Sequence, residues 1–160
     1  MNELIKSVYE QYKTNTGLFL RVFEGISRED SLKQIHENVN PLVYIAGHIV
    51  SARFVAARLL GLNEEYKYND ICRGGVELVD FKLYPTLDES LKDWNAVSEK
   101  IFTRLECISE GDFLAEPPGK FPTGDFTIRG AMVFMGSHDM YHIGQLIMIR
   151  KALGLKSPIG

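Results

Sequence analysis

Apolar residues recur at intervals of three and four along four long stretches of this chain, and turn-forming residues separate the stretches. This spacing is typical of amphipathic α-helices, and no segment alternates with the period of two that marks a half-buried strand. The pattern predicts four helices, over residues 2–25, 41–61, 87–108 and 127–153. We therefore expect an all-α protein, a four-helix bundle, formed by one domain of residues 1–160.

Residues with strong positional preferences mark several of the predicted helix ends. Pro41 is suited to the first position of the second helix, and Gly61 to the position just past its end. Thr86 and Glu89 have the spacing of a capping box at the start of the third helix. Thr127 can cap the fourth helix in the same way with its hydroxyl oxygen.

The connections between the predicted helices are unequal in length. Residues 62–86 form a longer link than two antiparallel neighbours require, which suggests a crossover connection between the second and third helices. Residues 109–126 contain EPPGKFPTG and are expected to be a loop. Both segments are candidates to roof a site, although for most residues of 62–86 taken singly a surface loop whose aromatic residues pack on the helices is the preferred interpretation.

Composition and charge exclude several classes of protein. The net charge is −3 and no Lys/Arg cluster is present, so the chain lacks the positive surface that nucleic-acid binding requires. No run approaches transmembrane length, and we expect no membrane association. Two cysteines, Cys72 and Cys107, cannot form a secreted disulfide framework and are interpreted as packed thiols. We expect a cytoplasmic protein.

Three of the four histidines point toward the predicted core. His138 and His142 lie about 40° apart on the fourth helix, on an apolar stripe, and His48 interrupts the apolar face of the second helix. A single buried histidine is usually satisfied by a nearby carbonyl or hydroxyl group. Three together are hard to satisfy with one another, because each buried ring without a partner costs roughly 1–3 kcal/mol. His36 precedes the second helix and is interpreted as a surface residue.

A divalent cation would resolve this conflict. Side chains at i and i+4 are about 5–6 Å apart at Cβ, so His138 and His142 can reach one ion, and His48 can complete the set from a facing helix. Three neutral ligands leave a position for water or substrate, which is the pattern of a catalytic site. Imidazole ligands accept zinc, nickel, copper or iron. The H-D-x-x-H motif is one residue type from the metalloprotease motif, but Asp139 is too short for that role, and we expect it to be solvated or to bond to a histidine ring.

Two further residues are candidates for the reaction itself. Gln145 lies on the histidine stripe, where it could orient a ligand at the open position or simply bond to the backbone or a ring. Tyr44, one turn before His48, could line the pocket or serve only as a core aromatic. Arg53 and Arg58 lie away from the His48 face and are interpreted as solvated or interface charges.

The sequence resembles the DinB-like superfamily of small four-helix proteins, which takes in metal-dependent hydrolases and thiol S-transferases. The likeness is carried by His48 within PLVYIAGHIVSARF and by the C-terminal SHDMYHIGQLIMIRKALGL, although the usual arginine after the second histidine is Ile143 here. The resemblance implies a bundle with a long crossover, often dimeric, in which His48, His138 and His142 hold nickel, zinc or a similar ion. Its enzymes join low-molecular-weight thiols such as bacillithiol or mycothiol to electrophiles.

Two functions remain open at this point. The first is a metal-dependent S-transferase or hydrolase that takes a small-molecule thiol and an electrophile. The second is a non-catalytic metal-binding or stress-response module in which the ion only ties two helices together.

A homodimer is also predicted. The second and fourth helices carry apolar residues opposite their histidines, which suggests that both are covered on two sides. These residues are Val50, Phe54, Ala57, Met140, Ile143 and Ile147. We expect the two subunits to pack through these two helices, with cover from the long loops as the alternative.

Overall fold

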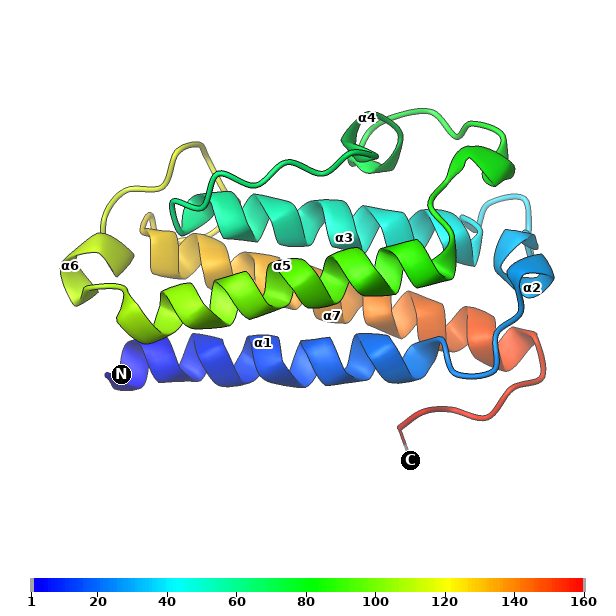
Figure 1. The fold of residues 1–160 in the computed structure, drawn as a ribbon, viewed down its shortest axis with the longest axis horizontal. Coiled ribbons are helices and arrows are strands. Elements are labelled where there is room, and N and C mark those ends of the chain that lie inside the picture. The colour runs from blue at the N-terminus through cyan, green and yellow to red at the C-terminus, as the bar shows by residue number, and fades with distance from the viewer. Residues whose placement is uncertain (1, 160) are drawn as a thin grey trace.

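Four long helices lie side by side in the computed structural model, which describes residues 2–159 (Figure 1). They are α1 (Glu3–Val22), α3 (Leu42–Leu59), α5 (Leu87–Cys107) and α7 (Ile128–Ala152). The described residues contain no strand, so the prediction of an all-helical fold is confirmed. The four predicted helices correspond to these four, with ends that differ by at most three residues.

Each long helix packs mainly against two others, so the four surround one core. α7 contacts α1 and α3, and α5 contacts the same two helices from the other side. Trp94 of α5 stacks on Phe19 of α1 with ring centroids 4.2 Å apart, and both side chains are fully buried. The first and last long helices of the chain are therefore direct neighbours, and both histidine-bearing helices, α3 and α7, are in contact.

The predicted capping interactions are present. Thr86 Oγ1 accepts a hydrogen bond from the Glu89 amide, and the Glu89 carboxylate accepts one from the Thr86 amide, which completes the capping box of α5. Thr127 accepts from the Gly130 amide at the start of α7. Pro41 has an extended backbone and is the N-cap of α3 rather than its first helical residue, a difference of one position.

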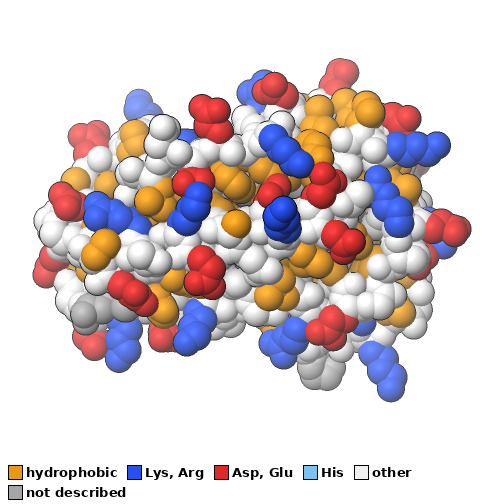
Figure 2. Space-filling view, in the orientation of Figure 1, with side chains coloured by type: hydrophobic (Ala, Val, Ile, Leu, Met, Phe, Trp, Pro, Cys, Tyr) orange, Lys and Arg blue, Asp and Glu red, His pale blue; other side chains and the backbone are white. Residues whose placement is uncertain are grey.

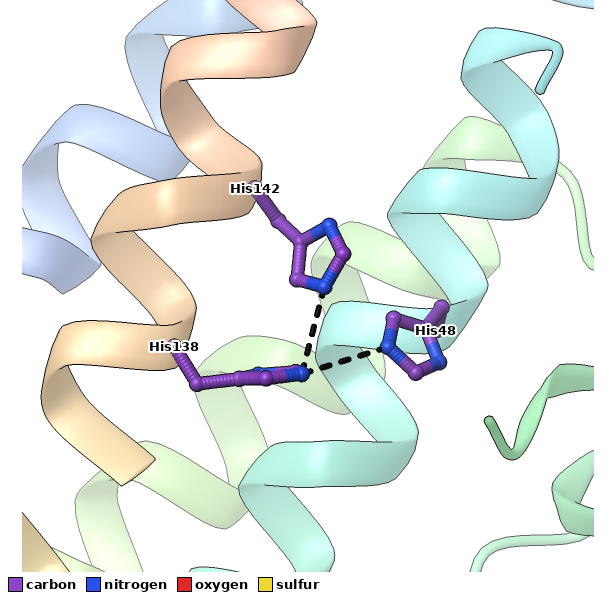
Figure 3. Close-up of side chains that lie close together, drawn as sticks. All are labelled: His48, His138 and His142. Atoms are coloured by element: carbon purple, nitrogen blue, oxygen red, sulfur yellow. Dashed lines mark hydrogen bonds between the residues drawn. The ribbon is translucent and has the colours of Figure 1, made fainter. Parts of the chain in front are cut away.

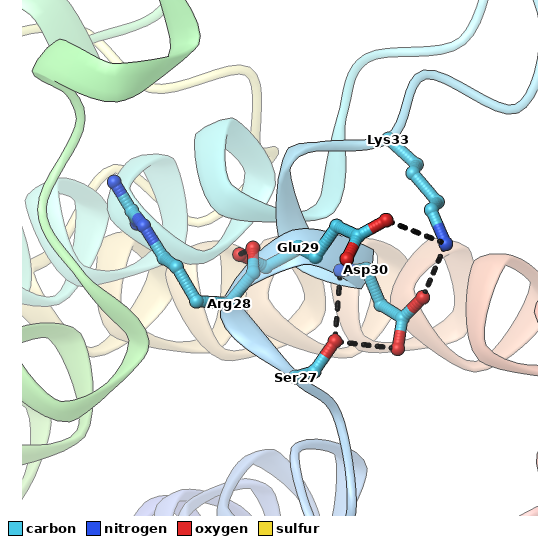
Figure 4. Close-up of polar contacts among 6 residues, drawn as sticks. Ser27, Arg28, Glu29, Asp30 and Lys33 are labelled. Carbon is cyan, nitrogen blue, oxygen red and sulfur yellow. Dashed lines mark hydrogen bonds and ion pairs between the residues drawn. The ribbon is translucent and has the colours of Figure 1, made fainter.

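Short helices interrupt the segments that were predicted as loops. They are α2 (Arg28–Leu32), α4 (Asn69–Cys72), the single 3-10 turn η1 (Phe81–Leu83) and α6 (Glu110–Phe113). Figure 4 shows how local polar contacts hold α2: Ser27 Oγ caps the Asp30 amide, and Lys33 Nζ lies 2.8 Å from Asp30 and 3.8 Å from Glu29. Such helices are too short to show apolar periodicity, which is why the pattern of the sequence did not predict them.

The connection 62–86 covers the second side of α3. It runs back along that helix and places α4 beside it (Figure 1), where Tyr66 stacks on Phe54 at 5.1 Å and Cys72 packs on Gly47. Val50, Phe54 and Ala57 are consequently buried within the single chain. The argument that these residues need a second subunit was therefore wrong for α3, and cover by the long connection is what the structure shows.

One helix, α3, is long and apolar enough to cross a membrane by length and composition, with a mean hydropathy of 1.4 over Leu42–Leu59. The prediction that no segment reaches this length was wrong, because the mean hydropathy of Leu42–Leu59 is high although the helix contains His48, Arg53 and Arg58. However, 83% of α3 is buried inside the chain, as in the core helix of a soluble protein. The outer face drawn in Figure 2 carries interspersed acidic and basic side chains.

Candidate metal centre

Three imidazole rings converge between α3 and α7 (Figure 3). His48 extends from α3, and His138 and His142 extend from successive turns of α7, so that one nitrogen of each ring faces the same point. His138 Nε2 lies 3.3 Å from His48 Nε2 and 3.2 Å from His142 Nε2, and all three ligand atoms lie within 4.8 Å of one another. The structure brings together the three residues predicted from the helix faces.

The spacing of these nitrogens fits a bound cation. Zinc–imidazole bonds of about 2.0–2.1 Å in a tetrahedral site separate neighbouring nitrogens by about 3.3 Å. The two separations from His138 Nε2 match that value closely, and the third pair, His48 and His142, lies within 4.8 Å. The rings are half-buried rather than enclosed, so an ion held here would retain access for a further ligand.

The outer nitrogens of two rings are fixed by acceptors. His48 Nδ1 lies 2.9 Å from the carbonyl oxygen of Cys72, and His142 Nδ1 lies 2.7 Å from Gln145 Oε1. Because these oxygens can only accept, each Nδ1 carries the proton, and each Nε2 presents its lone pair inward. His138 Nδ1 is buried and has no hydrogen-bond partner among residues 2–159.

The inward nitrogens cannot satisfy one another. His48 Nε2 and His142 Nε2 both present lone pairs toward His138 Nε2, whose single proton would have to serve both. A cation would accept all three lone pairs at once. The donor set is thus chemically suited to a divalent transition metal, since neutral imidazole is a ligand for zinc, nickel, copper and iron.

Electrostatics also favours neutral rings at this position. Burial lowers the pKa of all three histidines, and for His138 burial together with His142 and His48 lowers the pKa to about 4. The hydrogen bonds from His48 to Cys72 and from His142 to Gln145 oppose this effect only partly. The rings are therefore neutral near pH 7, each with one protonated nitrogen, and this is the form that binds metal.

Comparison with known families agrees with this geometry. The family model described as the DinB superfamily matches residues 11–146, which include all three histidines. The chain belongs to the DinB superfamily. No curated protein matches it.

Beside the histidines of this DinB-superfamily chain lies a groove of about 700 Å³. Apolar side chains such as Val39, Ile45 and Met148 line it, together with the amides of Asn38 and Gln145, and no charged residue contributes to it. Gln145 joins the groove to the cluster, because its Oε1 bonds to His142 while its Nε2 donates to Tyr141 Oη at 3.0 Å. The groove can thus hold an uncharged molecule next to the ring cluster.

Both candidate residues for the reaction lie next to the histidines. The ring of Tyr44 is stacked parallel to His48, with centroids 5.9 Å apart. Gln145 bonds to a histidine ring, which is one of the two roles that the sequence left open. Other segments complete the surroundings: Gly74 of the connection 62–86 lies beside His48, and Phe121 of the connection 109–126 packs near Phe134.

Two charged residues lie close to the histidines in the sequence, Asp139 directly after His138 and Arg53 five residues after His48, and neither is solvated. Asp139 and Arg53 are both fully buried, and Arg53 Nη2 lies 2.8 Å from Asp139 Oδ2. The predictions of a solvated or ring-bonded Asp139 and of a solvated or interface Arg53 were therefore wrong. Helix geometry gave no signal for this pair, since Asp139 is about 100° from His138 and Arg53 about 140° from His48, directions that the periodicity of the sequence assigns to solvent as readily as to the core.

The predictions for the remaining histidine, arginine and cysteine residues are confirmed in part. His36 and Arg58 are exposed, as expected for surface residues. Cys72 is buried, which confirms a packed thiol, whereas Cys107 is exposed and that part of the prediction was wrong. Burial raises the pKa of the Cys72 thiol to about 12, so its contribution is the backbone carbonyl that holds His48.

Proposed function

We propose that this protein is a metal-dependent enzyme in which His48, His138 and His142 hold one divalent transition metal, zinc or nickel, and that it transfers a low-molecular-weight thiol or water to an electrophilic small molecule. The observation that supports this best is the set of three inward nitrogens, two of them fixed by outer hydrogen bonds. Such a site supplies three neutral ligands and leaves a position open.

Each part of the chain has a role in this proposal. A bound metal ion lowers the pKa of a coordinated thiol or water, so that the nucleophilic anion exists near neutral pH. The Cys72 carbonyl and Gln145 Oε1 keep His48 and His142 in the tautomer that faces inward. Tyr44 shields the outer face of the His48 ring from water, because its buried ring lies parallel to that of His48.

The groove next to Gln145 is where we place the electrophile. Its lining is apolar with a few amides and no charge, which suits an uncharged substrate better than a polar thiol. The four long helices would then form a DinB-type four-helix bundle, with the connection 62–86 as the crossover that roofs the site. The exposed Cys107 and the buried Cys72 are both free thiols, which supports a reducing cytoplasm as the location.

The test is turnover by protein of known metal content. The protein is purified without chelators or affinity nickel, its metal is measured by elemental analysis, and a panel of thiols is tested with monochlorobimane. We expect metal-dependent conjugation that chelation abolishes and that His138→Ala lacks. His36→Ala, which removes an exposed histidine, serves as the matched control and retains activity. Metal-loaded protein that conjugates none of the thiols and shows no hydrolase activity would contradict the proposal.

A second function is supported by the position of the ligands on two different helices. An ion at this point would join α3 to α7 and could serve stability alone, as in a non-catalytic metal-binding or stress-response module. Cooperative unfolding on metal removal, together with absence of turnover, favours this function. Persistence of the fold in chelator with loss of turnover favours the enzyme.

A further inference from the structure

One side chain from each long helix meets at the centre of the core, behind the histidine cluster. The guanidinium of Arg53 from α3 is stacked between Tyr12 of α1 and Trp94 of α5, with its carbon 4.5 Å and 3.8 Å from the two ring centroids. Asp139 of α7 completes the group as the ionic partner of Arg53. Arg53 is 0% exposed and Asp139 is 1% exposed.

This ion pair is poorly suited to stabilising the fold. The contact is not a well-aligned hydrogen bond, and Arg53 Nε and Nη1 and Asp139 Oδ1 have no hydrogen-bond partner among residues 2–159. Removing two charges from water is expensive, and replacing a buried ion pair by apolar residues of similar volume is often neutral or stabilising. The ion pair is therefore weak evidence for a contribution to stability, even with two aromatic rings stacked on the guanidinium.

The position of the pair suggests what it does. Arg53 lies five residues after His48 on α3, and Asp139 directly follows His138 on α7. A buried polar pair can specify the register of two helices, because an ionic contact of 2.8 Å is lost after a small displacement. A shift of one residue moves a helix by about 1.5 Å along its axis, which would break the ion pair and also separate the nitrogens of His48 and His138.

We infer that Arg53 and Asp139 are positioning residues that fix the register of α3 against α7, and thereby hold the three histidines at metal-binding distance. The inference rests on the metal site of the proposed function but not on its catalytic chemistry. Neither the groove nor the three histidines need these two buried charges for their own chemistry. The inference therefore gives Arg53 and Asp139 a role of their own.

The experiment compares stability with metal geometry in the full chain. The double variant Arg53→Met/Asp139→Leu removes both charges together, so neither is left unpaired. In chelator, we expect its urea midpoint to equal or exceed that of the unmodified chain. With Co²⁺ as the probe, we expect at least a ten-fold loss of affinity and a changed visible absorption spectrum. Ile101→Val, a fully buried change on α5, which carries no ligand, is the control and keeps the original spectrum.

A second variant covers the case in which the double variant does not fold. Arg53→Gln/Asp139→Asn removes both charges together but keeps polar side chains of similar shape, and we expect weaker Co²⁺ binding with an altered spectrum. Original Co²⁺ affinity and spectrum in every folded variant of the pair would overturn the inference. Absence of Co²⁺ binding by the unmodified chain would instead overturn the proposed function itself, and the inference with it.

Discussion

Glu89 joins the long connection 62–86 to the start of α5. Its carboxylate accepts hydrogen bonds from the Thr86 amide at 2.9 Å and from Tyr68 Oη at 2.7 Å, and it pairs with Lys67 at 3.1 Å. These donors, the Thr86 backbone first, lower the pKa of Glu89 to about 2. A single surface carboxylate therefore contributes to both the helix cap and the placement of the connection.

The stability of the protein should depend on pH through Glu89. Its pKa in the folded chain is about 2, below the usual 4.5, so its contribution is complete above pH 4.5 and is lost as the pH falls toward 2. We expect Glu89→Gln to remove this part of the decline in the free energy of unfolding. Urea denaturation at a series of pH values measures it. Glu99→Gln, an exposed change on the same helix, is the control. An unchanged pH profile in Glu89→Gln would contradict this assignment.

At the scale of single residues, the candidate site could largely be predicted from the sequence. His48, His138 and His142 were found because each is a polar ring on an otherwise apolar helix face. Arg53 and Asp139 were missed because charged residues are usually solvated, and nothing in the local pattern shows that two charges 86 positions apart will meet.

Two helical glycines differ sharply in their surroundings. A Cβ on Gly47 would lie 2.6 Å from the sulfur of Cys72, whereas a Cβ on Gly17 of α1 would meet nothing within 4 Å. Gly47 thus allows the connection 62–86 to approach α3 closely enough for the Cys72 carbonyl to reach His48.

We expect opposite effects from alanine at these two positions. Gly47→Ala should destabilise the protein by about 1–3 kcal/mol, because the buried Cys72 must move, and should weaken metal binding through His48. Gly17→Ala should stabilise it by about 0.5–1 kcal/mol by restricting the unfolded chain. Urea denaturation measures both changes. Equal changes in the free energy of unfolding from the two substitutions would show that the connection 62–86 does not pack tightly against α3 at Gly47.

The groove can be tested through Gly144 of α7. A Cβ at Gly144, which lines the groove, would meet nothing within 4 Å, so a larger side chain fills the space without disturbing the helix. We expect Gly144→Leu to raise the KM for the electrophile roughly ten-fold or more, with metal content unchanged. Gly144→Ala is the smaller control. An unchanged KM for Gly144→Leu would show that the electrophile does not bind in this groove.

At the scale of helices, capping residues allowed good prediction of where α5 and α7 begin. Thr86 and Thr127 form the expected bonds because the amides of the first helical turn have no acceptor within the helix, and a side-chain oxygen at this position can reach one of them. The single turns α4 and α6 could not be predicted, since they depend on contacts with the long helices rather than on their own pattern.

At the scale of the whole molecule, the exposed side of α7 bears on self-association. α7 still exposes apolar side chains outside the groove, with Val133 at 39% and Met140 at 40% exposure, although α3 is covered within the chain. We propose a homodimer that packs mainly through this face of α7. Light scattering at micromolar concentration should give twice the mass of one chain, and Val133→Glu/Met140→Glu should reduce it to a single mass. A monomeric unmodified protein would refute the dimer.

The overall packing could be predicted only in part. Four amphipathic segments predict four packed helices, but the segment that covers the second side of α3 is an irregular connection with no period of its own. For this reason a helix that is apolar all round, such as α3, does not by itself indicate a second subunit.

The central ion pair also constrains how this chain can evolve. Replacing either Arg53 or Asp139 alone would leave an isolated charge in a dry interior, at a cost of about 3–5 kcal/mol. During evolution the ion pair can therefore be lost without this cost only if both residues are replaced in close succession. Among homologous proteins, we expect the two positions to change together or not at all, despite their separation along the gene.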